Sequence, residues 1–400
     1  MFQIRKGSKY LVFFVVIFVA LPPFAIDTYI PAFGNVADFF HVNVNSIAVT
    51  ISTYLVGFAL GMLVWGALSD RYGRKKILII GMSVYIISTI FCSYTENFNT
   101  LIFMRFVQGL GDSPAAVAAM AILKDCYRGQ KFIKTTATMI MVFMIAPIVA
   151  PIIGSIIIYT TGRWQDIFHF LTIYGIVLLF ITFMMPETHK SSKRAKSLLS
   201  SFTVYIKHLF NGPFMLGAMT GALGFGAMFS FISTSSNLII GYYHFGYAQF
   251  CAIFALNILG LGFASNLIKK KLTPHNRIRF ISFGYALAIA VVFINIMLSY
   301  AVENIYIFVV LNTFATAGFA LTNITISSVT IDLLKEGFGA GNAIMRLIKF
   351  IIAGLAGFLL SFISIQHLIV GIPAQQLIFI LLSAGLFFII KNKLFPATIT

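Results

Sequence analysis

Residues 66–76 read GALSDRYGRKK and separate two long apolar runs, Ser46–Leu68 and Ile77–Tyr94. Each run is long enough to cross a bilayer as a helix, so residues 66–76 are predicted to form a charged turn between two membrane helices. Asp70 is predicted to close the first helix, where an acid opposes the helix dipole, and we therefore expect it to serve a partner elsewhere. Gly73 suits a turn with positive φ or a close backbone approach. The cations that open the second helix are Arg71, Arg74, Lys75 and Lys76.

The composition independently predicts a membrane protein. Apolar residues make up 59% of the 400 and charged residues only 10%, and the mean hydropathy is +0.95. A net charge of +17 would indicate nucleic-acid binding in a soluble protein. Here most cations fall in alternate loops, at 71–76, 124–134, 190–207 and 269–279, as the positive-inside rule for membrane proteins predicts. That rule alone also explains the cations at 71–76. We therefore expect both termini on the cytoplasmic side and no nucleic-acid partner.

Twelve segments have the length of about 20 apolar residues that a membrane span requires. Each is predicted to be a helix, because a lipid-exposed strand would leave backbone groups unpaired. The first six spans are Tyr10–Pro31, Ser46–Leu68, Ile77–Tyr94, Leu101–Leu123, Thr135–Tyr159 and Ile167–Met185. The second six are Phe214–Ile240, Tyr247–Leu267, Ile278–Val302, Ile305–Ile331, Ala340–Ile363 and Ile372–Ile390. The predicted fold class is an all-α membrane protein.

One long polar connection, Glu187 to Lys207, divides these spans into two sets of six. An amphipathic piece is expected within it, around Phe202–Phe210. The predicted domains are residues 1–186 and 214–400, each a six-helix bundle, joined by a cytoplasmic linker at 187–213. Because both sets start on the same side of the membrane, they predict parallel halves with a solute site between them.

Five ionisable side chains fall inside the predicted spans, where a charge is costly and commonly functional. They are Asp27, Arg105, Asp112, Arg346 and Lys349. Successive spans alternate in direction, so Asp27 and Arg105 are expected at one level of the membrane as an ion pair. Asp112 follows Arg105 by seven residues, which places it two turns along the same helix face and about 10 Å deeper.

The two acids have a functional and a structural interpretation. A carboxyl whose surroundings change as a cavity opens and closes can take up a proton on one side of the membrane and release it on the other. The structural alternatives are a permanent pair between Asp27 and Arg105, and a helix contact at Asp112 beside Gly109 and Gly111.

Four motifs carry a resemblance to known transporters. Residues 66–76 closely resemble the signature loop of the major facilitator superfamily, Gly-x-Leu-x-Asp-Arg-x-Gly-Arg-Lys. DTYIPA at 27–32 resembles the Asp-x-Tyr-Leu-Pro-Ala of the bicyclomycin-resistance-type (Bcr/CflA) branch of drug–proton antiporters. RFVQGLG at 105–111 is similar to that branch's fourth-span motif, whose Arg is implicated in proton coupling. APIVAPIIG at 146–154 resembles the antiporter motif of the fifth span, and together the motifs imply the major facilitator fold.

The residues and the resemblance together assign three functional sets. The proton-coupling set is Asp27, Arg105 and Asp112, although the branch usually has a small residue at the position of Asp112. The expected solute-binding set is Tyr29, Tyr54, Gln108, Phe231, Asn323, Asn342, Arg346 and Lys349. The expected conformational switch is Gly66, Asp70, Arg71, Gly73, Arg74, Pro147, Pro151 and Gly154. Pro147 and Pro151 either form a seal between the two halves or only kink their helix. Tyr29, Tyr54 and Phe231 either line a cavity or face lipid and neighbouring helices.

The eleventh span departs from the branch, because Arg346 and Lys349 stand where Gly and Gln are typical. With Asn342 they follow the spacing i, i+4 and i+7, which forms a polar stripe on one helix face. Two cations there would attract an anion and repel lipophilic cations, so the solute is expected to carry carboxylates, as a siderophore or organic acid does. Alternatively, Arg346 reaches the membrane surface and pairs with Asp332 or Glu336.

These features predict a secondary transporter that exports a small organic solute in exchange for protons. The sequence has no ATP-binding Walker loop, and no cofactor or metal is expected. The alternatives are a multidrug efflux pump, a proton-coupled importer and, from another class, an intramembrane enzyme or sensor. An enzyme would need a nucleophile–base or metal constellation that no span supplies, so a non-enzymatic role is predicted. The expected setting is the inner membrane, as a monomer in the lipid bilayer.

Overall fold

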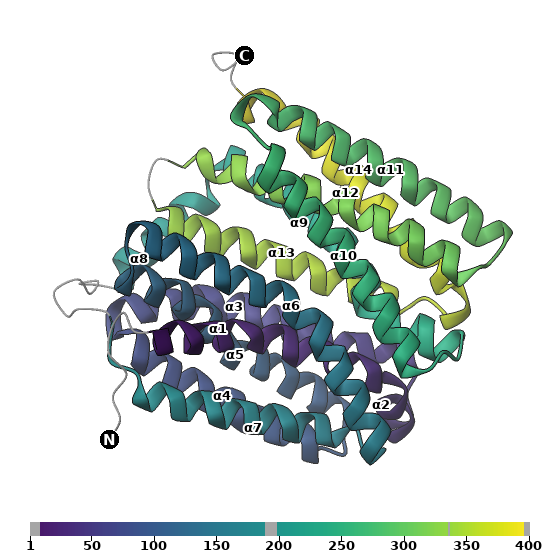
Figure 1. Cartoon of the computed structure of the whole chain (residues 1–400), viewed down its shortest axis with the longest axis horizontal. Coiled ribbons are helices and arrows are strands. Elements are labelled where there is room, and N and C mark those ends of the chain that lie inside the picture. The colour runs from purple at the N-terminus through teal and green to yellow at the C-terminus, as the bar shows by residue number, and fades with distance from the viewer. Residues whose placement is uncertain (1–8, 189–197, 335–336, 396–400) are drawn as a thin grey trace. The chain divides into compact units, whose positions relative to one another are not determined.

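The computed structural model of the chain describes residues 9–188, 198–334 and 337–395, and all regular elements in these ranges are helices (Figure 1). Twelve helical segments of this part are long and apolar enough to cross a membrane. The predicted all-α class with twelve spans is therefore confirmed. Lys190, Lys193 and Arg194 of the expected linker lie outside the described ranges.

Before the linker, the chain forms α1 (Lys9–Asp27), α2 (Phe33–Phe40), α3 (Ala48–Tyr72), α4 (Arg74–Tyr94), α5 (Phe98–Cys126), α6 (Gly129–Thr161) and α7 (Gln165–Met184). Helix α8 (Leu198–Leu209) follows, where the sequence predicts an amphipathic piece. The remaining helices are α9 (Gly212–Ser236), α10 (Tyr247–Lys271), α11 (Arg277–Ala301), α12 (Ile305–Asp332), α13 (Phe338–Leu360) and α14 (Leu368–Leu394). Most helices run a few residues beyond the predicted spans, because polar side chains at their ends do not interrupt helical hydrogen bonding.

The first span is not the single helix that the sequence predicts for Tyr10–Pro31. Helix α1 ends at Asp27, and a 3₁₀ turn at Ile30–Ala32 leads into α2. Pro31 has no N–H, so it cannot donate the helical hydrogen bond to the carbonyl of Asp27 four residues earlier. The break leaves Asp27 at a helix end within the first span.

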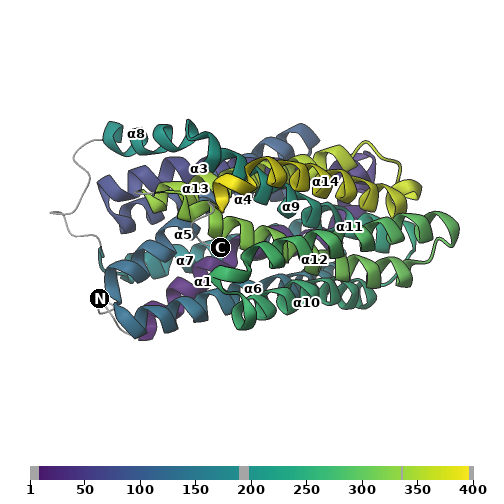
Figure 2. The same cartoon turned by 90° about the horizontal axis from the view of Figure 1, so that it is seen from above.

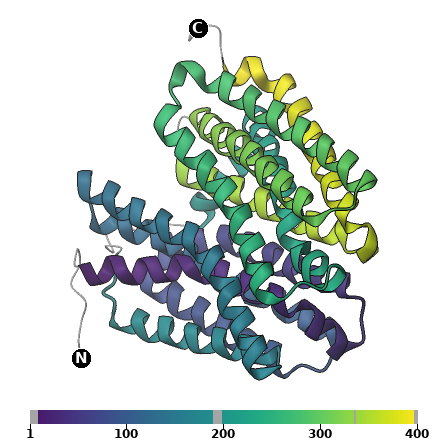
Figure 3. The ribbon, with the colours of Figure 1, turned by 45° about the vertical axis from the view of Figure 1, so that its right-hand side comes forward.

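Contacts divide the chain into two compact units. The first unit comprises Met1–His41 and Thr53–Thr203, and the second comprises Val42–Ser52 and Val204–Thr400. In the first unit α5 packs beside α1 and α4, α4 beside α7, and α1 beside α6 (Figures 1 and 3). In the second unit α9 packs beside α12, α13 and α14, and α11 lies beside α12 and α14 (Figure 2). The predicted domain limits stay a prediction.

Two glycines let the backbone of α5 approach its neighbours closely. A Cβ at Gly109 would lie 2.0 Å from the carbonyl oxygen of Tyr54, and one at Gly111 would lie 2.5 Å from the backbone nitrogen of Tyr85. Any larger residue would push α5 away from α3 or α4. These approaches bring the polar side chains of α5 against the two tyrosines.

Candidate functional site

The largest fully buried side chain of the first unit is that of Arg105, on α5. Its Nη1 donates hydrogen bonds to Gln108 Oε1 at 2.6 Å and to the carbonyl oxygen of Ala25 at 3.1 Å. Three aromatic rings also surround it, with ring centroids 4.8 to 5.7 Å from its Cζ. These rings belong to Tyr29, Tyr54 and Phe168. A cation that has lost water is therefore stabilised by π faces and neutral oxygens.

The predicted ion pair between Asp27 and Arg105 is wrong, since neither an ion pair nor a hydrogen bond joins these two described residues. The acid is buried, with 5% of its surface exposed. The guanidinium instead reaches the backbone of Ala25, two residues before Asp27. Sequence spacing places two residues at one level of the membrane, but it does not determine the rotation of each helix or the reach of each side chain.

Asp112 shares a partner with Arg105. It is fully buried, and its Oδ2 accepts a hydrogen bond from the hydroxyl of Tyr54, whose ring the guanidinium covers. The seven-residue spacing thus places both α5 side chains on the face that contacts Tyr54. Asp112 Oδ1 and the Nε and Nη2 atoms of Arg105 have no hydrogen-bond partner among the described protein atoms. The cation and the acid are linked through one phenol.

Gln108 connects this cluster to α4. Its Nε2 donates to Thr89 Oγ1 at 2.8 Å, and the Thr89 hydroxyl donates to the carbonyl oxygen of Tyr85 at 2.6 Å. The sequence assigns Gln108 to solute binding, whereas in this structure its amide is engaged by Arg105 and Thr89. Thr89, Tyr85 and Phe168 belong to the cluster but were missed, because nothing in the spacing of such common residues distinguishes them.

The antiporter-like segment of α6 lies against the turn after Asp27. A Cβ at Gly154 would lie 2.0 Å from the carbonyl oxygen of Thr28, so only a glycine allows this approach. Pro147 and Pro151 both lie within α6, which continues through them. Their role as a seal stays a prediction.

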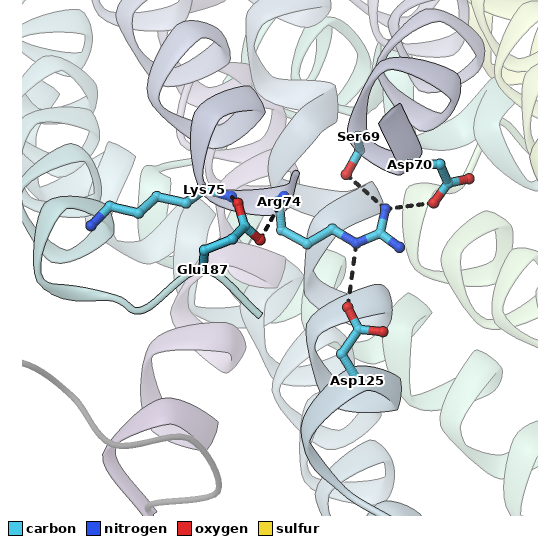
Figure 4. A network of polar contacts seen from close by, with 6 residues as sticks. All are labelled: Ser69, Asp70, Arg74, Lys75, Asp125 and Glu187. Atoms are coloured by element: carbon cyan, nitrogen blue, oxygen red, sulfur yellow. Dashed lines mark hydrogen bonds and ion pairs between the residues drawn. The ribbon is translucent and has the colours of Figure 1, made fainter. Parts of the chain in front are cut away.

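Arg74 organises the charged loop after α3 (Figure 4). Its Nη1 donates to Asp70 Oδ1 at 2.6 Å and to Ser69 Oγ at 2.9 Å, and its Nε donates to Asp125 Oδ2 at 3.5 Å. Glu187, which follows α7, accepts hydrogen bonds from the backbone N–H groups of Arg74 and Lys75 at the start of α4, at 3.1 and 3.3 Å. An acid at that position suits the positive end of the helix dipole.

Asp70 differs from its prediction in place and partner. It lies two residues before the end of α3, and its partner is Arg74, four residues later at the start of α4, rather than a distant group. Gly73 has a φ of 100°, as the sequence predicts. Arg71 lies over the ring of Tyr72 at 5.5 Å from the centroid.

The second unit carries its charges on α13. Lys349 Nζ donates to Ser327 Oγ of α12 at 2.9 Å, and that hydroxyl donates to the carbonyl oxygen of Asn323 at 2.5 Å. Asn342 and Arg346 are exposed. The predicted alternative that Asp332 pairs with Arg346 is wrong, because Asp332 accepts from Arg277 at 2.7 Å. The other candidate, Glu336, lies outside the described ranges.

The remaining solute-binding candidate, Phe231, is buried against Phe308. Sequence reasoning also missed a buried polar group on α14. Gln376 Nε2 donates to Asn312 Oδ1 at 2.9 Å, and Gln375 Nε2 donates to Ser230 Oγ at 3.1 Å. Two adjacent glutamines inside an apolar span were the available signal, since buried amides require partners.

Comparison with known proteins agrees with this helical architecture. The family model described as Major Facilitator Superfamily matches residues 12–357. The chain belongs to the major facilitator superfamily and is a multi-pass membrane transporter of that family.

Several relatives carry names from drug resistance. A bicyclomycin resistance protein homolog of Haemophilus influenzae is 31% identical over 67% of this chain and 68% of its own length. The multidrug resistance protein MdtL of Shigella dysenteriae is 28% identical over 68% of this chain and 71% of its own. An uncharacterised transporter of the superfamily from Bacillus subtilis, YdgK, is 27% identical over 84% of both chains. The resemblance to the bicyclomycin-resistance-type branch is thereby confirmed.

Solved structures share the fold at low identity. A D-xylose–proton symporter has a TM-score of 0.70 at 15% identity and covers 94% of this chain and 97% of its own. A bacterial homolog of the human lysosomal transporter Spinster has a TM-score of 0.72 at 12% identity over 98% of both chains. At these identities the likeness establishes the fold alone.

Proposed function

We propose that this transporter is a proton-coupled antiporter that exports a small organic solute by alternating access. The membrane would be the bacterial inner membrane, with both chain termini in the cytoplasm. The observation that carries the proposal is the buried cluster of Arg105, Tyr54 and Asp112 in the first unit. Ionisable groups at such depth are costly and mark ion pathways.

The geometry suits reversible protonation better than a permanent ion pair. Asp112 can hold a proton at Oδ1, the oxygen without a described partner, while Oδ2 keeps the hydrogen bond from Tyr54. The Arg105 cation lies over the ring of the same phenol and can stabilise the carboxylate after the proton leaves. Asp27 offers a second buried carboxyl at the end of α1. We assign proton coupling to Asp27, Arg105 and Asp112.

The names of the relatives support export over import, since bicyclomycin resistance and multidrug resistance are given for proteins 28–31% identical to this chain. They also make a multidrug efflux pump the second candidate. The two candidates differ in the charge of the preferred solute.

Everted membrane vesicles test the direction and the coupling. Respiration acidifies their interior, and a fluorescent dye then reports proton release when a solute is added outside. The probes are citrate as an anion, chloramphenicol as a neutral solute and tetraphenylphosphonium as a cation. We expect at least one probe to release protons from vesicles that contain the protein, and none to do so from vesicles with the Asp27→Asn, Asp112→Asn double variant.

The opposite results have clear meanings. Solute movement in the same direction as protons would identify an importer. Chemical conversion of a solute by the purified protein would identify an enzyme. Proton release by the double variant equal to that of the wild type would refute the coupling role of both acids.

A further inference from the structure

The charges of α13 lie on a face that is distinct from the one suited to lipid. Asn342 and Arg346 are exposed and one turn apart. Leu355 and Phe358 are also exposed. Arg346 and Leu355 are separated by nine residues, or about 2.5 turns, which places them on opposite sides of the helix. The apolar exposed face suits lipid, so the polar exposed face on the opposite side is available for another contact.

The cations of this face have no acidic partner among the described residues. The described acids of the second unit are Glu303 and Asp332, and each is engaged elsewhere. Glu303 Oε1 accepts from the hydroxyl of Tyr242 at 2.7 Å, and Asp332 pairs with Arg277. Among the described residues, Lys349 donates to the neutral hydroxyl of Ser327. A membrane helix thus carries two positive charges with no described compensating carboxylate.

The Lys349 ammonium is held in place by a hydrogen bond to α12. The Ser327 hydroxyl that accepts from its Nζ is itself fixed to the carbonyl oxygen of Asn323. An ammonium group has three donors, so this anchor leaves two for another acceptor. Arg346, three residues earlier on the same side of α13, adds a planar donor group that can bind an oxyanion through two parallel hydrogen bonds.

We infer that Arg346 and Lys349, together with Asn342, bind the carboxylate groups of an acidic solute. The inference rests on the proposed transport of a small solute and specifies its chemical class. Charge-assisted hydrogen bonds from both cations hold the oxyanion, and the exposed Asn342 amide adds a neutral donor. Lipophilic cations are repelled from the same face.

Equilibrium binding tests this site without any proton gradient. The purified full chain is placed in nanodiscs of phosphatidylcholine, and binding of radiolabelled citrate is followed by scintillation proximity. We expect saturable binding that unlabelled citrate displaces and the uncharged propane-1,2,3-tricarboxamide does not. Arg346→Gln and Lys349→Gln should each weaken it about tenfold, the loss of one charge-assisted contact. Lys349→Arg should retain binding within about threefold, because the charge remains.

Arg279→Gln is the matched control, because Arg279 is an exposed cation near the start of α11. It should bind citrate as the wild type does. The proposal is overturned if the wild type shows no saturable citrate binding, or if both glutamine variants bind citrate as tightly as the wild type. It is also overturned if the tricarboxamide competes equally.

A second lipid composition distinguishes a solute site from a lipid site. If phosphatidylglycerol nanodiscs abolish citrate binding, the face binds a lipid headgroup and the inference is wrong. Citrate binding that persists in both lipids supports it. Because binding is measured at equilibrium, loss of proton coupling in the vesicle assay would leave this result unchanged, so the two proposals can fail separately.

Discussion

The two units accommodate intramembrane cations in different ways. In the first unit Arg105 is fully buried, and aromatic rings and neutral oxygens occupy its surroundings. In the second unit Arg346 is exposed, and Lys349 donates a hydrogen bond to the hydroxyl of Ser327. A buried cation that is enclosed by its own unit is not free to bind a solute, whereas an exposed cation on a polar helix face is free to do so.

The acids follow the same division. The first unit has the buried acids Asp27 and Asp112 within its spans, and Asp112 shares Tyr54 with the buried cation, whereas the described acids of the second unit lie at or next to helix ends and are engaged there. An intramembrane carboxyl can carry a proton, and a cation without a compensating acid attracts an anion. The difference therefore supports proton coupling in the first unit and solute recognition in the second.

The largest effect is expected for Arg105→Lys. Lysine keeps the charge but lacks the planar donor group that reaches both Gln108 and Ala25 while stacking between rings. Loss of two hydrogen bonds to a charged group corresponds to a decrease in gradient-driven export of about 100-fold. Initial rates in everted vesicles measure it, and Arg163→Lys, at an exposed position, is the control. Near-normal export by Arg105→Lys would show that the positive charge alone suffices.

The next effect is expected for Asp27→Asn, which should uncouple transport from the pH gradient and leave solute binding intact. The amide is similar in size to the carboxyl but cannot release a proton, so gradient-driven export should fall about tenfold or more while solute exchange without a gradient continues. Comparison with Asp112→Asn shows which acid is essential. Full gradient-driven export by Asp27→Asn would leave Asp112 as the proton carrier.

The sequence predicts the twelve spans well because the bilayer demands about 20 apolar residues for each, and few other segments satisfy that requirement. It predicts the intramembrane charges for the same reason, since each stands out in an apolar run. The prediction of an ion pair between Asp27 and Arg105 was wrong because hydropathy and spacing give only the depth of a residue along its helix. Contacts between side chains also depend on the rotation of each helix about its axis. The rings around Arg105 could not be selected among 43 Phe and 16 Tyr.

An effect specific to the acidic solute is expected for Arg346→Gln combined with Lys349→Gln. This change should raise the KM for citrate about tenfold or more, raise the KM for chloramphenicol much less, and leave the dependence on the pH gradient unchanged. Asp27→Asn and Asp112→Asn in the first unit should instead change the dependence on the pH gradient and leave the preference between the two solutes unchanged. If Arg346→Gln combined with Lys349→Gln abolishes proton coupling with both solutes, the division of roles between the units is wrong.

The smallest effect is expected in the charged loop, where Arg74 and Asp70 differ in burial. The side chain of Arg74 is 9% exposed and holds three partners, whereas that of Asp70 is 54% exposed and holds one. Removing Arg74 takes away a nearly buried set of charge-assisted bonds, which is expected to cost about 2 kcal/mol of stability. An exposed ion pair is worth about 0.5 kcal/mol, because water and salt screen it.

Asp70→Asn should therefore lower the thermal midpoint of the detergent-purified protein less than Arg74→Gln does. The asparagine side chain still presents an oxygen that can accept the hydrogen bond from Arg74 Nη1, which further reduces the loss. Raising the salt concentration should reduce the shift in thermal midpoint caused by Asp70→Asn. The shift caused by Arg74→Gln should remain mostly unchanged, since salt screens buried bonds less. Equal shifts in both variants would mean that Asp70 has a partner beyond this loop, as its place near a helix C-terminus originally predicts.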